Sequence, residues 1–381
     1  MRRRLALLSC LFLAASANAE GFRERFVDPE DGQFDMSKYL LEHRGALVVP
    51  IVITEPAVGY GGGLALAWFS ESIGDAARRA QETGGRLTPP NIYGLAAFGT
   101  ENGTKGAAGG ARMSFLDDSI RYRGAIADVS VNLDFYGEGG GLAPGIDKIG
   151  YNLKGFMTFQ ELTHRLGDTD QFFGARWLYT DLGTSLDIGT ESDTGLTPRQ
   201  FAKKSSGLGV TYVYDSRDNI FATKNGVQGS LDAMFYSPSI GSDTTFQAYR
   251  AHVFAYIPAG DQVVVGLRAD YRMARGDVPF YQLPFIDMRG IPAARYQDEN
   301  TVVLETEVRY YATPRWIVLG FAGAGRAWGR RASFDGTDTQ SSAGVGFRYV
   351  VARRLGLAIG LDVARGPEKT AYYLQVGNSW R

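Results

Sequence analysis

Hydrophobic and polar residues alternate along most of the chain beyond residue 45. In the run 302–311 one face carries apolar residues such as Leu304 and Val308, while the other carries Glu305, Glu307 and Arg309. A period of two is the pattern of a β-strand, not of a helix. The same alternation recurs in 149–160, 226–236 and 263–272. Runs of about ten to twelve residues are longer than ordinary soluble strands and match what a tilted strand needs to cross a bilayer.

The pattern predicts sixteen strands, an even number that allows both chain ends to lie on one side of a barrel. The predicted spans are 46–54, 59–69, 91–100, 106–116, 121–133, 149–161, 172–183, 205–215, 226–236, 244–256, 263–273, 302–312, 315–327, 341–350, 355–365 and 371–380. The connections 117–120, 258–262, 313–314 and 351–354 are short, whereas 134–148, 184–204, 274–301 and 328–340 are mostly long. Short turns at one end and long loops at the other are typical of outer-membrane barrels. The long connection 70–90 falls at the short-turn end and breaks this rule.

Alternation alone fits a soluble β-sandwich as well, with its apolar face turned inward. Strand length, the position of aromatic residues and an export signal favour a membrane barrel, whose apolar face meets lipid. Aromatic residues near the predicted strand ends form a candidate girdle that includes Trp68, Trp177, Tyr236, Tyr256, Tyr310, Trp316 and Trp380. We therefore predict an all-β fold, a transmembrane antiparallel β-barrel.

The first nineteen residues read as a signal peptide. Arg2, Arg3 and Arg4 precede a short apolar stretch, and Ala17-Asn18-Ala19 supplies a small-residue cleavage site. An uncleaved anchor and lipidation at Cys10 are the alternatives. Cleavage removes the only cysteine of the chain.

Composition narrows the function. The 381 residues include 40 Lys and Arg against 41 Asp and Glu, and this balance excludes the basic surface of a nucleic-acid-binding protein. Three His and one Cys exclude a multi-ligand zinc or iron–sulfur site, so we expect no metal and no cofactor. Glycine, at 49 residues, and the 12% aromatic content suit barrel strands and girdles.

Catalysis is not expected. Outer-membrane lipases and deacylases need a His–Ser pair with an orienting polar residue. Neither His164 nor His252 has such a sequence context, and a lone histidine in a barrel is more often a hydrogen-bonding group of the lumen. We predict that the protein is not an enzyme.

The segment 20–45 precedes the barrel and is acidic. Asp28, Glu30, Asp31 and Asp35 do not have the spacing of an EF-hand calcium loop, so we expect a solvated acidic leader. Asp35 is a candidate cap for a short helix that runs to His43.

The C-terminal half resembles the bacterial surface-antigen barrel shared with BamA and TamA. Asp215, Arg217, Asp218, Asn219 and Gly226 look like the family's turn motif, except that Thr223 stands where the family usually has proline. The segments 283–290, 321–325, 343–349 and 361–364 follow in the family's order, and 50–63 looks like the opening hairpin of its stand-alone members. The resemblance covers roughly residues 46–381.

The resemblance implies a long outer loop that folds back into the lumen, with Arg289 and Gly290 at its tip. An unpaired guanidinium there is costly, and in the family an aspartate pairs with it. Gly323 occupies that aspartate's position here, so the usual pair cannot form. Asp362, Glu305 and Glu307 are the predicted substitutes. A solvated Arg289 is the alternative.

The resemblance also implies how the protein reaches its membrane and what it does there. The last strand carries a candidate insertion signal for the barrel-assembly machinery, Tyr372, Leu374, Val376 and Trp380. The 20–45 segment is too short for the POTRA domains of BamA, so a stand-alone outer-membrane form is expected. We expect outer-membrane lipid and an unfolded client or a periplasmic partner as contacts, and assistance in protein insertion or translocation as the function. A pore or a purely structural barrel are the alternatives.

Overall fold

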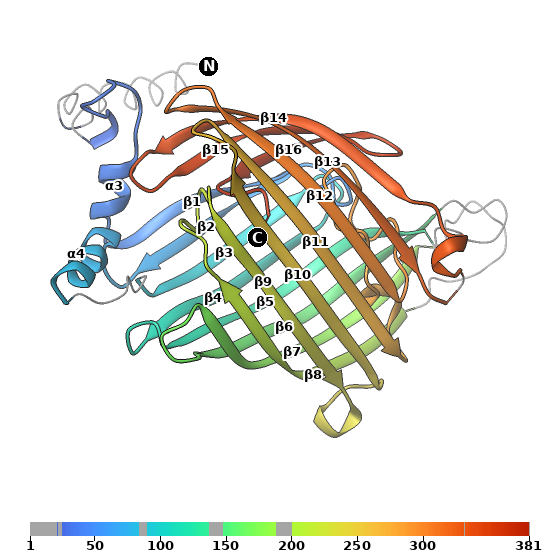
Figure 1. Ribbon diagram of the computed structural model, residues 1–381. Coiled ribbons are helices and arrows are strands. Elements are labelled where there is room, and N and C mark those ends of the chain that lie inside the picture. Colours follow the sequence, from blue (N-terminus) through green and yellow to red (C-terminus); the bar gives the residue numbers. More distant parts are fainter. Residues whose placement is uncertain are drawn as a thin grey trace, which may run out of the picture.

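The computed structural model describes residues 21, 25–83, 90–136, 148–187, 200–330 and 332–380, so the predicted signal peptide, 1–19, lies outside the described residues. Among these residues, sixteen antiparallel strands form one sheet in which each pairs with its neighbours in the sequence (Figure 1). Each overlaps one predicted strand, and the fold class is confirmed. The strands are β1 Gly45–Ile53, β2 Gly61–Phe69, β3 Ile92–Thr100, β4 Lys105–Phe115, β5 Ile120–Phe135, β6 Ile149–Arg165, β7 Gln171–Asp187, β8 Gln200–Asp215, β9 Gly226–Tyr236, β10 Phe246–Pro258, β11 Val263–Gly276, β12 Asn300–Tyr311, β13 Trp316–Trp328, β14 Gln340–Ala352, β15 Leu357–Arg365 and β16 Thr370–Val376.

The short helices α3 and α4 lie at one end of the barrel. Helix α3 (Ser37–Glu42) precedes β1, and helix α4 (Ile73–Thr83) occupies the long connection between β2 and β3. The two helices pack against each other at the end where β1 begins and β16 ends, which we call the inner end (Figure 1). In the described parts of the chain, neither helix is long and apolar enough to cross a membrane.

The pattern of burial is the reverse of that in a soluble protein. On β12 the apolar Leu304 is 58% exposed, whereas Glu307 on the opposite face is fully buried and Arg309 is nearly so. Apolar residues of β2 and β13, including Trp68 and Trp316, are likewise exposed. An apolar surface around a charged interior is the arrangement that a bilayer requires of a closed sheet. This observation excludes the soluble sandwich.

The wall is uneven in height. Strands β1, β2 and β3 have nine residues each, and β15 and β16 have nine and seven. On the opposite side, β5 to β8 have sixteen or seventeen residues. The shortest strands therefore flank the place where the first and last strands meet.

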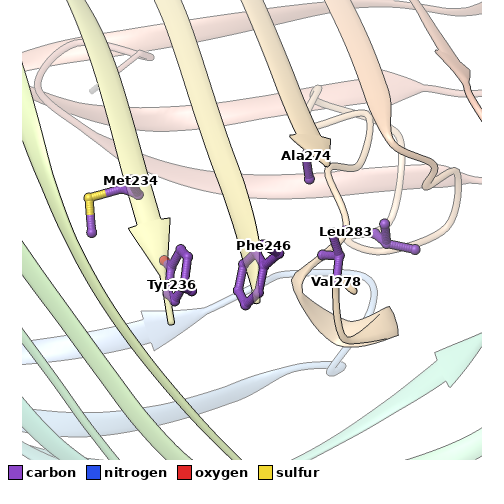
Figure 2. Close-up of a cluster of buried hydrophobic side chains, with 6 residues drawn as sticks. All are labelled: Met234, Tyr236, Phe246, Ala274, Val278 and Leu283. Atoms are coloured by element: carbon purple, nitrogen blue, oxygen red, sulfur yellow. The ribbon is translucent and has the colours of Figure 1, made fainter. Parts of the chain in front are cut away.

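The connection from β11 to β12, residues 277–299, folds into the lumen from the outer end, and we call it the lumen loop. Its first part packs Val278 and Leu283 against Phe246 of β10 and Tyr236 of β9 (Figure 2). Further on, Ile286, Met288 and Ile291 pack against Val303 and Ala327 of the wall. The ring of Phe280 lies 5.2 Å from that of Phe135 and 5.1 Å from that of Tyr151, on the other side of the lumen. The lumen loop therefore crosses the barrel, as the resemblance implied.

Three aromatic residues of the expected girdle lie inside the barrel. Tyr236 and Tyr256 are buried among lumen-facing residues. The predicted last strand ended at residue 380, but β16 ends at Val376, and Gly377, with φ of +75°, turns the chain inward. The ring of Trp380 consequently packs against Phe254 and Tyr256 in the lumen and is 4% exposed.

Candidate functional site

The lumen loop places Arg289 among three carboxylates of the barrel wall. Its Nη1 atom is 2.7 Å from Oε2 of Glu307 and 2.9 Å from Oδ2 of Asp362, and its Nε atom is 3.4 Å from Oε1 of Glu305. The guanidinium carbon also lies 3.5 Å from the centre of the Phe321 ring. The three carboxylate side chains are at most 1% exposed. Such burial is tolerated because opposite charges are in direct contact.

Each of these carboxylates also pairs with an arginine of the wall. Arg268 contacts Glu305 at 2.8 Å, Arg309 contacts Glu307 at 2.7 Å, and Arg348 contacts Asp362 at 2.6 Å. The tip of the loop is therefore one member of a continuous network that extends over β11, β12, β14 and β15. Arg289 contacts all three of the carboxylates that the sequence offered as substitutes, Asp362, Glu305 and Glu307.

Gly323 leaves the space that this network occupies. A Cβ atom at position 323 would lie 2.5 Å from Cγ of Glu305 and 2.5 Å from Sδ of Met288. Gly290 follows Arg289 with φ of +91°, and its Cβ would lie 3.2 Å from Cβ of Ser342. The carboxylate that the family supplies from the position of Gly323 is thus replaced by carboxylates of β12 and β15.

We expect Gly323→Ala to destabilise the barrel by roughly 1–3 kcal/mol, because the added methyl group overpacks the loop tip. Urea unfolding in lipid vesicles measures this change. Gly320→Ala is the matched control on the same strand, since its new Cβ would find its nearest atom at 3.9 Å. Equal stabilities of the two variants would contradict the close packing at Gly323.

The seam between β1 and β16 has no ladder in the described residues, although every other neighbouring pair of strands does. At its outer end the lumen loop bridges the gap. The backbone N–H of Gly290 donates to the hydroxyl of Tyr373 on β16 at 2.9 Å, and that of Ala293 donates to Glu55, just after β1, at 3.1 Å. Lys369 donates to the carbonyl oxygen of Pro56 at 3.1 Å.

At the inner end a buried arginine holds the N-terminal segment. Residues 28–37, which we call the strap, lie against the turns before β13 and β15. Arg315, whose side chain is 2% exposed, contacts Asp28 at 2.7 Å and both Asp31 and Asp35 at 2.6 Å. Its hydrogen bonds, together with the N–H of Gln33, lower the pKa of Asp31 to about 2.

Backbone contacts reinforce the strap. The N–H of Met36 donates to the carbonyl oxygen of Val351 at 2.6 Å. The hydroxyl of Tyr349 donates to the carbonyl oxygen of Phe34 at 2.9 Å. Beyond the strap, α3 leads directly into β1. The strap therefore joins the first strand to β13–β15 and passes the seam at its inner end.

The expectation of a solvated acidic leader was wrong. Asp28 is 9% exposed and Asp35 is 5% exposed, because Arg315 draws their carboxylates together. Asp35 accepts a hydrogen bond from the N–H of Ser37 at 2.6 Å, and the helix it precedes ends at Glu42, one residue before His43. The strap is held by the pairing of three acidic residues with an arginine about 280 positions away, and no local sequence signal connects them.

The turn motif lies at the inner end between β8 and β9. Arg217 pairs with Asp215 at 2.8 Å, and Asp218 accepts from the N–H of Lys224 at 3.1 Å. Asn219 donates to the carbonyl oxygen of Leu355, in the turn before β15, at 3.0 Å. Gly226 has φ of +117° where the backbone of Ser216 approaches closely. The motif thus ties the β8–β9 turn to the far side of the barrel mouth.

Thr223 and the C-terminal segment account for the departure from the family motif. The Thr223 hydroxyl donates to the carbonyl oxygen of Asn219 at 2.6 Å and accepts from Nδ2 of Asn378 at 2.9 Å. Proline at this position would have no hydroxyl for either bond. Of the candidate insertion signal, Tyr372 and Val376 are exposed on the outer face, Leu374 is partly exposed, and Trp380 lies in the lumen.

The lumen also contains a serine–histidine contact that the sequence did not reveal. Oγ of Ser230 is 3.1 Å from Nδ1 of His252 and donates to Asp232 at 3.0 Å. Ser230 and His252 are directly opposite on β9 and β10. Because Oγ of Ser230 donates to Asp232, Nδ1 of His252 can donate to the same oxygen, as a hydrogen-bonding group of the lumen would.

The comparisons with known proteins address the fold. No protein-family model and no curated protein matches the sequence. Among solved structures, BamA from Haemophilus ducreyi lacking POTRA domains 1–3 is similar with a TM-score of 0.59 and 11% identity, over 88% of this chain and 70% of that one. CdiB from Acinetobacter baumannii is similar with a TM-score of 0.53 and 11% identity, over 87% and 59%. The chain therefore has the barrel fold of BamA, and the resemblance found in the sequence is confirmed at that level.

Proposed function

We propose that this protein is an outer-membrane barrel of the BamA/TamA-like surface-antigen family that assists the insertion or translocation of other proteins through its seam. The observation that carries the proposal is that, among the residues the structure describes, β1 and β16 form no ladder while every other neighbouring pair of strands does. An unpaired edge presents N–H and C=O groups to which an extended client segment can add as a strand.

The sequence of β1 supports its role as an edge strand. Pro50 lies in its middle, and proline, which has no N–H to donate, is confined within sheets to edges, strand starts and bulges. Within the described part of the chain, opening at this place breaks the bridges at the two ends of the seam and no row of ladder hydrogen bonds.

The shortness of the strands beside the seam also supports opening between β1 and β16. A nine-residue strand is about 30 Å long and, once tilted, reaches only about 20–25 Å across a hydrocarbon core of about 30 Å. The seven residues of β16 span even less. A bilayer that meets this wall must thin locally, and a thinner bilayer lowers the barrier for a polar client backbone.

The partners follow from this proposal. Lipid covers the apolar face, an unfolded barrel protein or a periplasmic carrier meets the seam, and the barrel-assembly machinery inserts the chain itself. Tyr372, Leu374 and Val376 remain the candidate signal on the last strand. We propose no catalytic activity.

The test locks the seam in living cells. Cysteines replace the exposed Val48 of β1 and Val376 of β16 in a Cys10→Ala background and are joined by a short reducible crosslinker. We expect crosslinking to lower the amounts of other outer-membrane barrels as deletion of the gene does, and reduction to restore them. Cysteines at Leu231 and Val253, exposed on the paired strands β9 and β10, are the control. An unchanged outer-membrane proteome in the deletion strain would contradict the proposal.

A pore is the second candidate, favoured by cavities that the lumen loop leaves open. One of about 760 Å³ lies near the outer end beside Asn102, Asn132 and Lys148, and one of about 810 Å³ lies nearer the inner end. Large steady single-channel currents in planar bilayers would favour the pore.

A further inference from the structure

In the inner cavity of about 810 Å³, cationic side chains outnumber carboxylates. Its wall belongs to strands β4 to β10, the turn after β8, the inner ends of β15 and β16, and the C-terminal segment. Three carboxylates line it, those of Glu161, Asp215 and Asp232. Six arginines line it: Arg112, Arg121, Arg123, Arg176, Arg217 and Arg250.

Most of these arginines are paired. Arg176 contacts both Glu161 and Asp232 at 2.5 Å, and Arg217 contacts Asp215 at 2.8 Å. Arg121 pairs with Asp118 below the cavity, and Arg250 pairs with Asp270 of the loop-tip side of the wall. The carboxylates of the cavity are thus engaged.

The two other arginines of the cavity, Arg112 and Arg123, lie where positive charge exceeds negative charge. Arg112 of β4 and Arg123 of β5 are directly opposite in the ladder, and both face the cavity. Arg123 reaches only Glu161, at 3.1 Å, which Arg176 already holds more closely, and its side chain is 57% exposed. Arg112 is exposed and has no hydrogen bond or ion pair with any residue that the structure describes.

Like charges placed directly opposite on neighbouring strands destabilise a sheet. The repulsion disappears when an anion lies between the two guanidinium groups, each of which presents a planar set of donors suited to phosphate oxygens. The cavity is large enough for a small molecule. Arg112 and Arg123 lie near the ends of β4 and β5 that face the inner end of the barrel, and the cavity extends from them to the turn after β8.

We propose that Arg112 and Arg123 form the core of a binding site for a small soluble anion that carries a phosphate or diphosphate group. Arg121 lies two residues from Arg123 on the same face and completes the cationic wall. The site is separate from the seam and from the tip of the lumen loop, and it does not depend on whether the seam opens.

The experiment titrates inorganic pyrophosphate into the detergent-purified full-length protein by isothermal titration calorimetry in a phosphate-free, low-salt buffer. We expect saturable binding at one site, and about tenfold or greater weakening in Arg112→Gln, because a charge-assisted hydrogen bond is lost. Arg365→Gln, at the outer end of β15 with only a 3.5 Å contact to Thr370, removes the same charge elsewhere and should leave binding unchanged. Absence of saturable heat, or equal affinity in Arg112→Gln, overturns the proposal.

The melting temperatures of the same proteins provide a second, independent measurement. Without added anion, Arg112→Gln should melt at or above the temperature of the wild-type protein, because it relieves the repulsion with Arg123. Pyrophosphate should raise the melting temperature of the wild-type protein and not that of the variant. A lower melting temperature of the ligand-free variant would show that Arg112 has a structural partner and would overturn the proposal.

Discussion

Replacing Arg315 with glutamine is expected to release the strap from the inner end of the barrel. Three carboxylates converge on this guanidinium, and two of them, Asp28 and Asp35, are nearly buried. Removal of one partner of a buried ion pair costs about 3–5 kcal/mol because the remaining charges are left uncompensated. We expect roughly 3 kcal/mol here, since the strap can detach and rehydrate its carboxylates without unfolding the sheet, and this corresponds to a more than hundredfold loss of docking.

Spin labels measure the consequence at the seam. One pair at Val48 and Val376 reports the inner half, and a pair at Val52 and Tyr372 reports the outer half, all on the exposed face. In Arg315→Gln the inner distance distribution should lengthen and broaden, while the outer one, bridged by the lumen loop, stays as it is. Arg354→Gln is the matched control, because among the described residues Arg354 meets the strap through its backbone N–H and not through its side chain. An unchanged inner distance would contradict the role of the strap.

Acid should reproduce the effect in the wild-type protein. The folded-state pKa of Asp31 is about 2, below the ordinary value near 3.9. A carboxylate with a depressed folded-state pKa stabilises docking fully above about pH 4, and this stabilisation is lost as the pH falls toward 2. The inner spin-label distance should therefore begin to lengthen below about pH 4 in the wild-type protein and depend less on pH in Arg315→Gln.

The sequence predicted the barrel well because its main determinant is local. Alternation along ten or more residues fixes which face of a strand meets lipid, and sixteen such runs could be located within a few residues. Glu305 and Glu307 could be assigned to the lumen on that basis alone. Turn signals in 216–225 likewise follow from neighbouring residues.

Contacts between distant residues were the part that sequence reasoning missed. Arg315 is the first residue of the predicted strand 315–327 and lies in the turn just before β13, and no neighbouring residue indicates its contacts with Asp28 and Asp35. Trp380 continues the alternation of β16, so only the turn at Gly377 reveals that its ring enters the lumen. Arg112 and Arg123 alternate correctly, but their direct opposition depends on the register of β4 and β5.

Substitution of Arg289 by alanine is expected to destabilise the barrel by about 3 kcal/mol, as for a buried ion pair that loses one partner. Asp362→Asn should cost at least as much, because Asp362 holds both Arg289 and Arg348. The double variant should lose less stability than the sum of the two single losses. Once Asp362→Asn has removed its carboxylate, Arg289 contributes less, and its removal costs less. We expect a coupling energy above about 1 kcal/mol for residues in such direct contact.

Urea unfolding in lipid vesicles gives these energies, and planar-bilayer conductance reports the loop. Arg295→Ala is the control within the same loop. Its partner Glu368, at 2.9 Å, is one-third exposed, so that this variant should lose at most about 1 kcal/mol. Arg289→Ala should also raise the conductance. The buried guanidinium packs on Phe321 and holds the tip of the lumen loop, where Gly290 donates to Tyr373, so its removal should free the tip to leave the lumen. Additive energies in the double variant would instead place Arg289 and Asp362 in independent interactions, and the lumen loop would then be held chiefly by its apolar contacts with Val303 and Ala327.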